Sequence, residues 1–255
     1  MVIVLRAGCL LWIALLWIAL PWAGASMGAG VAATGGALDT AAAANSILRA
    51  ANAFRQQQGR GTLTANAQLG KAAQEFASFM ARTRRFSHEA DGREPADRAR
   101  GHGYAYCIVD ENIGFEQRDP EFTSDELAAR LMQGWEASPP HRRNLLDPDV
   151  VDTGIGLAQD PGTGRWYGVQ MFGAPESARV TFDVTNDTGS NVRYRLGERT
   201  FELAPRVTRT HQECRPASLK LDSAGDAARS TVQPRNGGHY RVVRDASGSI
   251  GLAAD

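Results

Sequence analysis

The sequence has no excess of charge of either sign, because its 28 basic residues are balanced by 28 acidic ones. This balance excludes a general electrostatic attraction to nucleic acids or to anionic membranes, so no nucleic-acid partner is expected. Lysine is almost absent, since it occurs only at Lys71 and Lys220 and every other basic residue is arginine. We interpret the arginine bias as genomic composition; the alternative is that arginine stems line an anion-binding surface.

Long apolar runs are also scarce, and only the first 25 residues contain one. Arg6 precedes the run, Pro21 follows it, and the small residues Ala23 to Ala25 provide a cleavage site. This layout is typical of a secretory signal peptide over residues 1–25. We expect an exported protein, periplasmic or secreted; the alternative is an uncleaved N-terminal membrane anchor.

Cysteine is rare, and cleavage after Ala25 leaves only Cys107 and Cys214. In an oxidising compartment two cysteines can form one disulfide. A Cys107–Cys214 bridge and a pair of free thiols both remain open at this point.

The chain divides by pattern into a flexible Ala/Gly-rich linker (26–44), an α+β domain (45–175) and a small β-rich module (178–255). The linker has almost no large apolar group, and a first helix is predicted from about Asn45. A second helix is predicted from the spacing of Leu69, Ala73, Phe76 and Met80.

Further along the domain, the sequence predicts a short helix over 95–101 and a strand near 107–109. A capping box at Thr123–Glu126 opens another helix, and strands follow over 154–158 and 166–172. Such an order favours helices packed around a small antiparallel sheet. The last segment alternates apolar and polar residues, which predicts a sandwich or open barrel without helices, with His211 and His239 in solvated turns.

Four motifs occur in order within the α+β segment: FSHEADG from Phe86, ENIG from Glu111, GWEASPPHRRNLL from Gly134, and GIGLA followed by WYGVQMFG from Gly154. Together they resemble the bacterial branch of the CAP superfamily, whose module is also called the SCP domain. The superfamily includes cysteine-rich secretory, antigen-five and pathogenesis-related proteins. The resemblance covers about half of the chain and implies a three-layer α-β-α sandwich with a central antiparallel sheet and a cleft on one side.

Members of this superfamily commonly place two histidines and two glutamates in that cleft. His88 and His141 match the histidines, and Glu111 matches the glutamate of the EN motif. The second glutamate is missing: Ser138 occupies its position, and Glu136 lies at the wrong spacing. The resemblance therefore implies a three-residue ligand-binding cleft.

Two imidazoles and one carboxylate could hold zinc or another divalent cation and activate a water molecule. However, the chain lacks the H-x-x-x-H helical pair of zinc proteases. The alternative is a hydrogen-bonded network in which Glu111 orients one of the histidines. We expect supporting roles for Trp135 in the core, for Ser138 at a helix end, and for Asn112, Arg142 and Asn144 in tying backbone groups together. A nucleophilic pair of Ser138 with His141 is disfavoured, because no nucleophile elbow surrounds the serine.

Two functions follow from these observations. The favoured hypothesis is a non-enzymatic binding module whose cleft holds a small amphipathic molecule, an envelope glycan or a peptide, with the β module attaching the protein to the cell envelope. The alternative is a metal-assisted hydrolase that acts on peptides or envelope polymers.

Overall fold

The structure is a computed structural model that describes residues 38–118, 121–215, 217–222 and 231–254. The predicted signal peptide (1–25) and most of the predicted linker (26–44) lie outside these ranges. Among the residues that are described, no helix is both long enough and apolar enough to cross a membrane.

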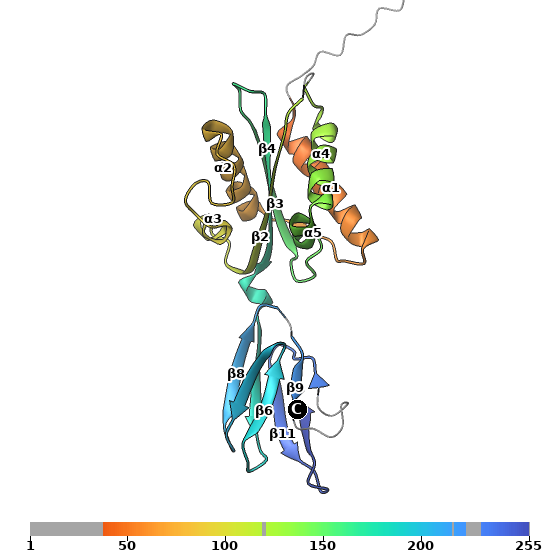
Figure 1. Ribbon diagram of the computed structural model, residues 1–255, viewed down its shortest axis with the longest axis vertical. Coiled ribbons are helices and arrows are strands. Elements are labelled where there is room, and N and C mark those ends of the chain that lie inside the picture. The colour runs from red at the N-terminus through yellow and green to blue at the C-terminus, as the bar shows by residue number, and fades with distance from the viewer. Residues whose placement is uncertain (1–37, 119–120, 216, 223–230, 255) are drawn as a thin grey trace, which may run out of the picture. The chain divides into compact units, whose positions relative to one another are not determined.

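The segment that begins at Thr40 and ends at Pro175 forms three layers (Figure 1). One helical layer contains α1 (Thr40–Gln57), α4 (Ser124–Ala137) and α5 (Pro139–Leu145), and the other contains α2 (Ala67–Thr83) and α3 (Pro95–Gly101). The sheet between them has the order β1 (Thr64–Ala65), β3 (Asp152–Gln159), β4 (Trp166–Pro175) and β2 (Tyr106–Glu116). β4 pairs antiparallel with both β3 and β2, as predicted, and the short β1 adds a parallel pair with β3.

The central strand β4 is buried along nearly its whole length, because both faces of the sheet are covered. Its alternating side chains enter two cores. Val169 and Met171 pack with the apolar face of α2, and Phe172 and Ala174 pack with α1 and α4. The predicted face of α2 is confirmed, since Leu69, Ala73, Phe76 and Met80 are all fully buried in this first core.

The first helix begins earlier than the sequence predicts. α1 starts at Thr40, so the last five residues of the predicted linker are helical. Asp39 caps the helix, because its Oδ1 accepts hydrogen bonds from the backbone N–H groups of Ala41 and Ala42. The alanine run that was interpreted as a flexible linker has high helix propensity, and the aspartate before it supplies the start signal.

The GWEASPPH segment contains the end of one helix and the beginning of another. The capping box of Thr123 and Glu126 opens α4, as predicted. Ser138-Pro139-Pro140 was expected only to end that helix, but Ser138 is also the N-cap position of α5, and Pro139 and Pro140 occupy its first turn. Proline is favoured there because the first turn has no partner for its backbone N–H groups. His141 therefore lies on a helix.

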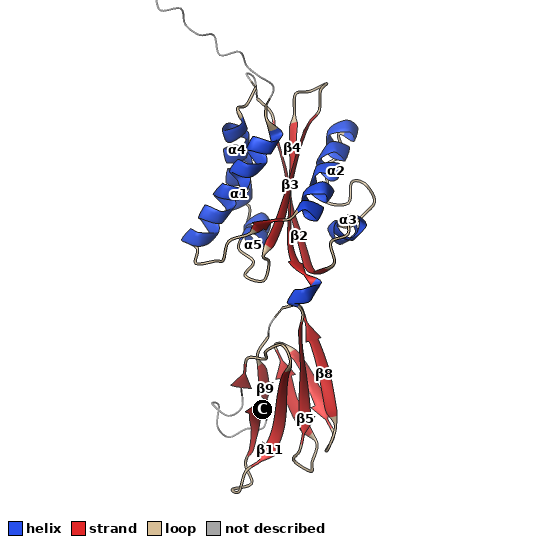
Figure 2. Ribbon diagram, turned by 180° about the vertical axis from the view of Figure 1, so that it is seen from behind, coloured by secondary structure: helices blue, strands red, loops and turns tan. Residues whose placement is uncertain are grey.

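After the 3-10 turn η1 (Glu176–Ala178), the described chain contains strands only (Figure 2). One sheet has the order β12 (Ile250–Ala254), β11 (Gly238–Arg244), β5 (Val180–Asn186) and β8 (Thr208–Glu213). The other has the order β10 (Thr231–Val232), β9 (Leu219–Leu221), β6 (Val192–Leu196) and β7 (Arg199–Leu203). Apolar side chains from both sheets form a single core, which makes this module a β-sandwich.

The prediction that His211 lies in a solvated turn is wrong. His211 is a buried residue of β8, and its Nε2 lies 2.8 Å from the hydroxyl of Tyr194. Its ring stacks on Phe182, and burial lowers its pKa. His239 is also in a strand, β11, although its side chain is exposed as expected.

Cys107 and Cys214 form a disulfide. Cys107 lies near the start of β2, and Cys214 follows β8 of the sandwich. The bridge spans 107 residues of sequence and joins the α+β segment covalently to the β module.

Candidate functional site

The candidate site lies around β2, which is the edge strand of the central sheet. Successive side chains of a strand point to opposite faces. Glu111 contacts α3, whereas the next residue, Asn112, contacts α5 on the opposite face. The first two residues of the ENIG motif therefore place one polar side chain against each helical layer.

Glu111 is held by a buried arginine that the sequence reasoning did not identify. Nη2 of Arg98, on α3, donates to both carboxylate oxygens of Glu111 at 3.0 and 2.8 Å. Each of these two side chains is only 1% exposed. Burial of both charges costs desolvation free energy, and removal of either partner would leave the other charge buried and unpaired. The main effect of the pair is therefore to fix the position of the carboxylate.

The same arginine shapes the loop that presents His88. Arg98 donates to the backbone carbonyl of His88 at 2.9 Å and to Oδ1 of Asp91 at 2.8 Å. Asp91 lies in the turn that the hydrogen bond from Gly92 N–H to the Glu89 carbonyl closes, and Gly92 adopts a φ of 78° that glycine accepts without strain. His88 Nδ1 lies 2.8 Å from Oε1 of Glu111, and its side chain remains 46% exposed. The FSHEADG motif thus forms a loop whose exposed imidazole is oriented by a buried carboxylate.

Two asparagines tie α5 to β2 on the other face. Asn112 Nδ2 donates to the backbone carbonyl of His141 at 3.1 Å. Asn144 Nδ2 donates to the backbone carbonyl of Glu111 at 3.0 Å and to Oδ1 of Asn112 at 2.9 Å. Trp135 fills the core and donates its indole N–H to the carbonyl of Ile113 at 3.1 Å.

These contacts bring the two histidines around the edge strand from opposite layers. The ring centroids of His88 and His141 lie 6.5 Å apart. Burial lowers the pKa of His141, and the charge of His88 lowers it further, so His141 is neutral at neutral pH. His88, Glu111 and His141 therefore form one cluster, in which His88 bridges the other two.

Of the remaining expected supporting residues, Arg142 acts differently from the prediction and Ser138 lies where it was predicted. The Arg142 guanidinium donates to the side chain of Gln58 and lies over the ring of Phe54, so it ties no backbone carbonyl in this cluster. Ser138 lies at a helix end as predicted, between α4 and α5, although its side chain makes no capping hydrogen bond. Arg142 is directed away because it lies on a different face of α5 from His141.

The donor set does not fit a metal centre. Both oxygens of Glu111 accept from the Arg98 guanidinium, whose positive charge at about 3 Å would repel a divalent cation. Across the described part of the chain, no three His, Cys, Asp or Glu side chains are grouped so that they could hold a metal ion. The arrangement instead matches the hydrogen-bonded network in which the glutamate orients a histidine.

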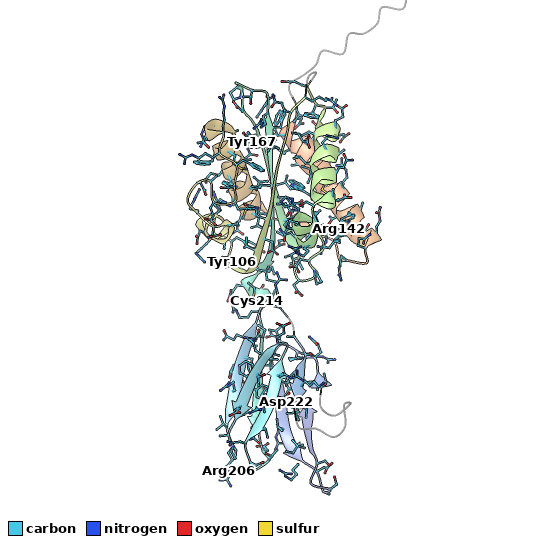
Figure 3. The ribbon with its side chains drawn as sticks, in the orientation of Figure 1. Tyr106, Arg142, Tyr167, Arg206, Cys214 and Asp222 are labelled. Atoms are coloured by element: carbon cyan, nitrogen blue, oxygen red, sulfur yellow. A yellow bond between two sulfur atoms is a disulfide. The ribbon has the colours of Figure 1, made fainter. Side chains whose placement is uncertain are left out.

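An exposed aromatic pair comes from the same two segments, with Phe86 two residues before His88 and Phe115 on β2. Phe86 and Phe115 are 42% and 44% exposed, and their rings meet edge to face at 5.0 Å. The buried Tyr167, labelled in Figure 3, contacts both rings, and the Arg165 guanidinium lies 4.6 Å from the ring centre of Phe115. We call His88, His141, Phe86 and Phe115 the histidine–aromatic surface.

A sequence signal for the aromatic pair was present. Phe86 precedes His88 by two residues, and Phe115 follows Glu111 by four residues of the same strand. An even spacing on a strand places side chains on one face, so a strand predicted as far as Glu116 would have put Phe115 on the same face as Glu111. The prediction stopped near Val109 and missed it.

Known proteins show related sequences and structures. Residues 48–172 match the CAP family, the Cysteine-rich secretory protein family. YkwD of Bacillus subtilis (strain 168) is 28% identical over 114 residues, which are 44% of this chain and 41% of that protein. The match thus spans about two fifths of this relative's length.

Two solved structures are also similar over about half of the chain. An outer surface protein of Borrelia burgdorferi has a TM-score of 0.48 and 19% identity, and the match covers 55% of this chain and 97% of that one. An extracellular protein from Bacillus anthracis that contains an SCP domain has a TM-score of 0.43 and 24% identity, and the match covers 52% of this chain and 41% of that one.

Proposed function

Through residues 48–172 the chain belongs to the cysteine-rich secretory protein (CAP) family, and from this premise we propose that it is an exported, non-enzymatic binding module. Its ligand is a small amphipathic molecule, an envelope glycan or a peptide that occupies the histidine–aromatic surface. The bacterial relatives named above are consistent with a bacterial member of the family.

The observation that supports binding best is that exposed side chains lie around a buried ion pair that holds one of them in position. Glu111 is buried and paired with Arg98, so it is a positioning group for His88. The exposed imidazole of His88 offers a hydrogen-bonding nitrogen, and Phe86 and Phe115 offer exposed apolar rings. A few polar groups next to aromatic side chains are typical of ligand sites that recognise amphipathic molecules.

Among the three ligand classes, an envelope glycan fits this surface best. A sugar ring presents hydroxyl groups at its rim and C–H groups on its faces. The hydroxyls match the His88 and His141 nitrogens, and the C–H faces match the exposed phenylalanine rings. A metal-assisted hydrolase is not favoured, because the one carboxylate of the cluster is already paired with a guanidinium.

Export is supported by the N-terminal sequence and by the disulfide. Residues 1–25 have the composition of a signal peptide, and Cys107 and Cys214 are bonded. Disulfides persist mainly outside the reducing cytosol. The similar proteins described as extracellular or as outer surface proteins agree with a periplasmic or secreted location.

Binding can be tested with the mature chain and three sets of probes: soluble peptidoglycan fragments, N-acetylglucosamine oligomers and medium-chain fatty acids. Thermal shift identifies the probes that bind, and calorimetry measures their affinity. We expect Phe115→Ala and His141→Ala each to weaken binding by roughly tenfold, because each removes one buried contact with the ligand. The matched control is Val207→Ala, which removes an exposed apolar side chain from the β module.

The proposal fails if every bound probe retains its affinity in both site variants. Release of sugar or peptide products that stops on addition of a chelator and in His88→Ala would instead support the hydrolase. Far-UV circular dichroism and the melting temperature of each variant are compared with those of the wild-type protein, so that loss of binding is not confused with loss of the fold.

A further inference from the structure

A hollow of about 640 Å³ lies beside α5. Four arginines line it: Arg60, Arg142, Arg143 and Arg215. Its volume is within the range of small-ligand sites, roughly 300–1,000 Å³. We call it the arginine hollow; Arg142 and Cys214, the neighbour of Arg215, are labelled in Figure 3.

The arginine hollow is separate from the histidine–aromatic surface. Pro139, Arg142, Arg143 and Leu146 line it, and their spacing of three, four and seven residues places them on one face of α5. His141 is two residues from Pro139 and therefore points about 200° away around the helix. None of His88, Glu111 and His141 lines the hollow.

Among the described residues, three of the four arginines form no ion pair with a carboxylate. Arg142 contacts the neutral Gln58 side chain and the Phe54 ring, and its charge also acts on the Glu136 carboxylate without an ion pair between them. In the part of the chain that the structure describes, no Asp or Glu lies within ion-pair distance of Arg60, Arg142 or Arg143. By contrast, Arg84, Arg93, Arg98, Arg100, Arg118 and Arg130 of the same domain all pair with carboxylates.

The fourth arginine holds the acidic groups of the hollow. Arg215 contacts both lining carboxylates, Asp147 at 2.5 Å and Asp110 at 3.5 Å, and it also contacts Asp149, which is outside the lining, at 3.3 Å. Its neighbour Cys214 is bonded to Cys107 on β2, so the disulfide fixes Arg215 next to Asp110. Arg215 thus pairs with the carboxylates of the hollow. The guanidinium groups of Arg60, Arg142 and Arg143 remain available to an anionic ligand.

We propose that the arginine hollow binds a phosphate group. The residues that line it carry four positive and two negative charges (4 − 2 = +2), and a phosphate monoester carries about −1.5 to −2 at neutral pH. Guanidinium groups bind phosphate oxygens through paired N–H donors, which is geometry that lysine cannot supply. Ala137, Pro139, Leu146 and Pro148 provide an apolar wall for the part of the ligand that carries the phosphate.

The phosphate could belong to a soluble phosphorylated molecule or to a phospholipid headgroup, and the experiment separates these sources. Calorimetry on the mature chain uses inorganic phosphate and glycerol 3-phosphate as soluble probes. Flotation uses phosphatidylcholine vesicles with and without phosphatidylglycerol. Binding of the soluble probes alone assigns a soluble ligand, and additional binding to the anionic vesicles assigns a headgroup.

The test variants are Arg60→Gln and Arg143→Gln, which remove one unpaired cation each. We expect each to weaken binding of the phosphate probes roughly tenfold, as is usual for one charged hydrogen bond. The matched control is Arg82→Gln, an exposed position on α2 in the opposite helical layer. His141→Ala should also leave phosphate binding unchanged, which distinguishes this site from the histidine–aromatic surface.

Two results would overturn the proposal. One is equal phosphate affinity in the double variant Arg60→Gln/Arg143→Gln and in Arg82→Gln. The other is failure of the wild-type chain to bind any of the phosphate probes at millimolar concentration. Both can occur whether or not a ligand of the histidine–aromatic surface is found.

Discussion

Arg98 is the residue on which the geometry of the candidate site depends. Its guanidinium contacts Glu111, Asp91 and the backbone carbonyl of His88, and it lies 3.6 Å from the ring centre of Phe76. One side chain thus connects α3, β2, α2 and the histidine loop. Its Nε is buried without a hydrogen-bond partner, so the contacts of the two terminal nitrogens outweigh that cost.

Replacement of Arg98 by methionine should lower the free energy of unfolding by about 3–5 kcal/mol, because Glu111 would remain buried without its cation. Urea unfolding followed by circular dichroism measures the change. The matched control is Arg100→Met on the same helix, where the pair with Asp97 is exposed, and we expect a loss below about 1 kcal/mol there. Equal losses at the two positions would contradict the buried-pair interpretation.

At the scale of elements, α2 and β3 approach more closely than side chains normally allow. A Cβ atom on Gly154 would lie 2.1 Å from the backbone of Leu69 and Gly70, and one on Gly156 would lie 2.3 Å from the backbone of Ala73. The GIGLA motif is therefore a packing motif, in which two glycines on one face of β3 receive the backbone of the helix.

The substitution Gly156→Ala should destabilise the domain by about 1–3 kcal/mol or more, because helix backbone cannot move aside as a flexible side chain can. Gly134→Ala is the control: that glycine is inside α4 with open space around its Cβ position, and alanine there should stabilise the helix by about 0.5–1 kcal/mol. Opposite signs in thermal unfolding are the expected result. A neutral Gly156→Ala variant would show that α2 is not in direct contact with β3.

At the scale of the whole molecule, the disulfide is the covalent link between the α+β segment and the sandwich. It closes a loop of 107 residues, which restricts the unfolded chain far more than a short loop would. In the folded chain it also places Arg215 beside the acidic residues of the arginine hollow.

The double variant Cys107→Ser/Cys214→Ser should lose about 4–5 kcal/mol of unfolding free energy, as the chain-entropy estimate for a loop of about 100 residues predicts. Guanidinium unfolding without reductant measures the loss, and the wild-type protein in reductant should approach the variant. Two titratable thiols in denatured, unreduced wild-type protein would disprove the bridge.

Local sequence patterns predicted the elements whose signals lie within one or two helical turns. The buried face of α2, the capping box of α4 and the alternation of Val180, Phe182 and Val184 in β5 are examples. α5 was missed because its first turn contains two prolines, which were interpreted as an end rather than a start. His211 was missed because β8 has a polar sequence that does not indicate a strand. Only the folded chain places the His211 ring in the core beside Phe182.

The candidate site was predicted only in part, for a similar reason. Motif resemblance gave His88, Glu111 and His141 as a group. Nothing local to Arg98 showed that this arginine, rather than a metal ion, neutralises Glu111, because the two residues meet only when α3 packs beside β2. The arginine hollow likewise depends on Arg60 and Arg215, which are 155 residues apart in sequence and meet only in the folded chain.

The order of strands in the central sheet has a consequence for synthesis. Within the described residues, β2 pairs only with β4, and β4 is the last strand of this sheet to leave the ribosome. Until about residue 175 has emerged, the growing polypeptide therefore cannot complete the sheet around Glu111. We infer that a nascent chain stalled before Trp166 leaves both β2 and β3 exposed to chaperones. A nascent chain that extends past Pro175 has every strand it needs for this sheet.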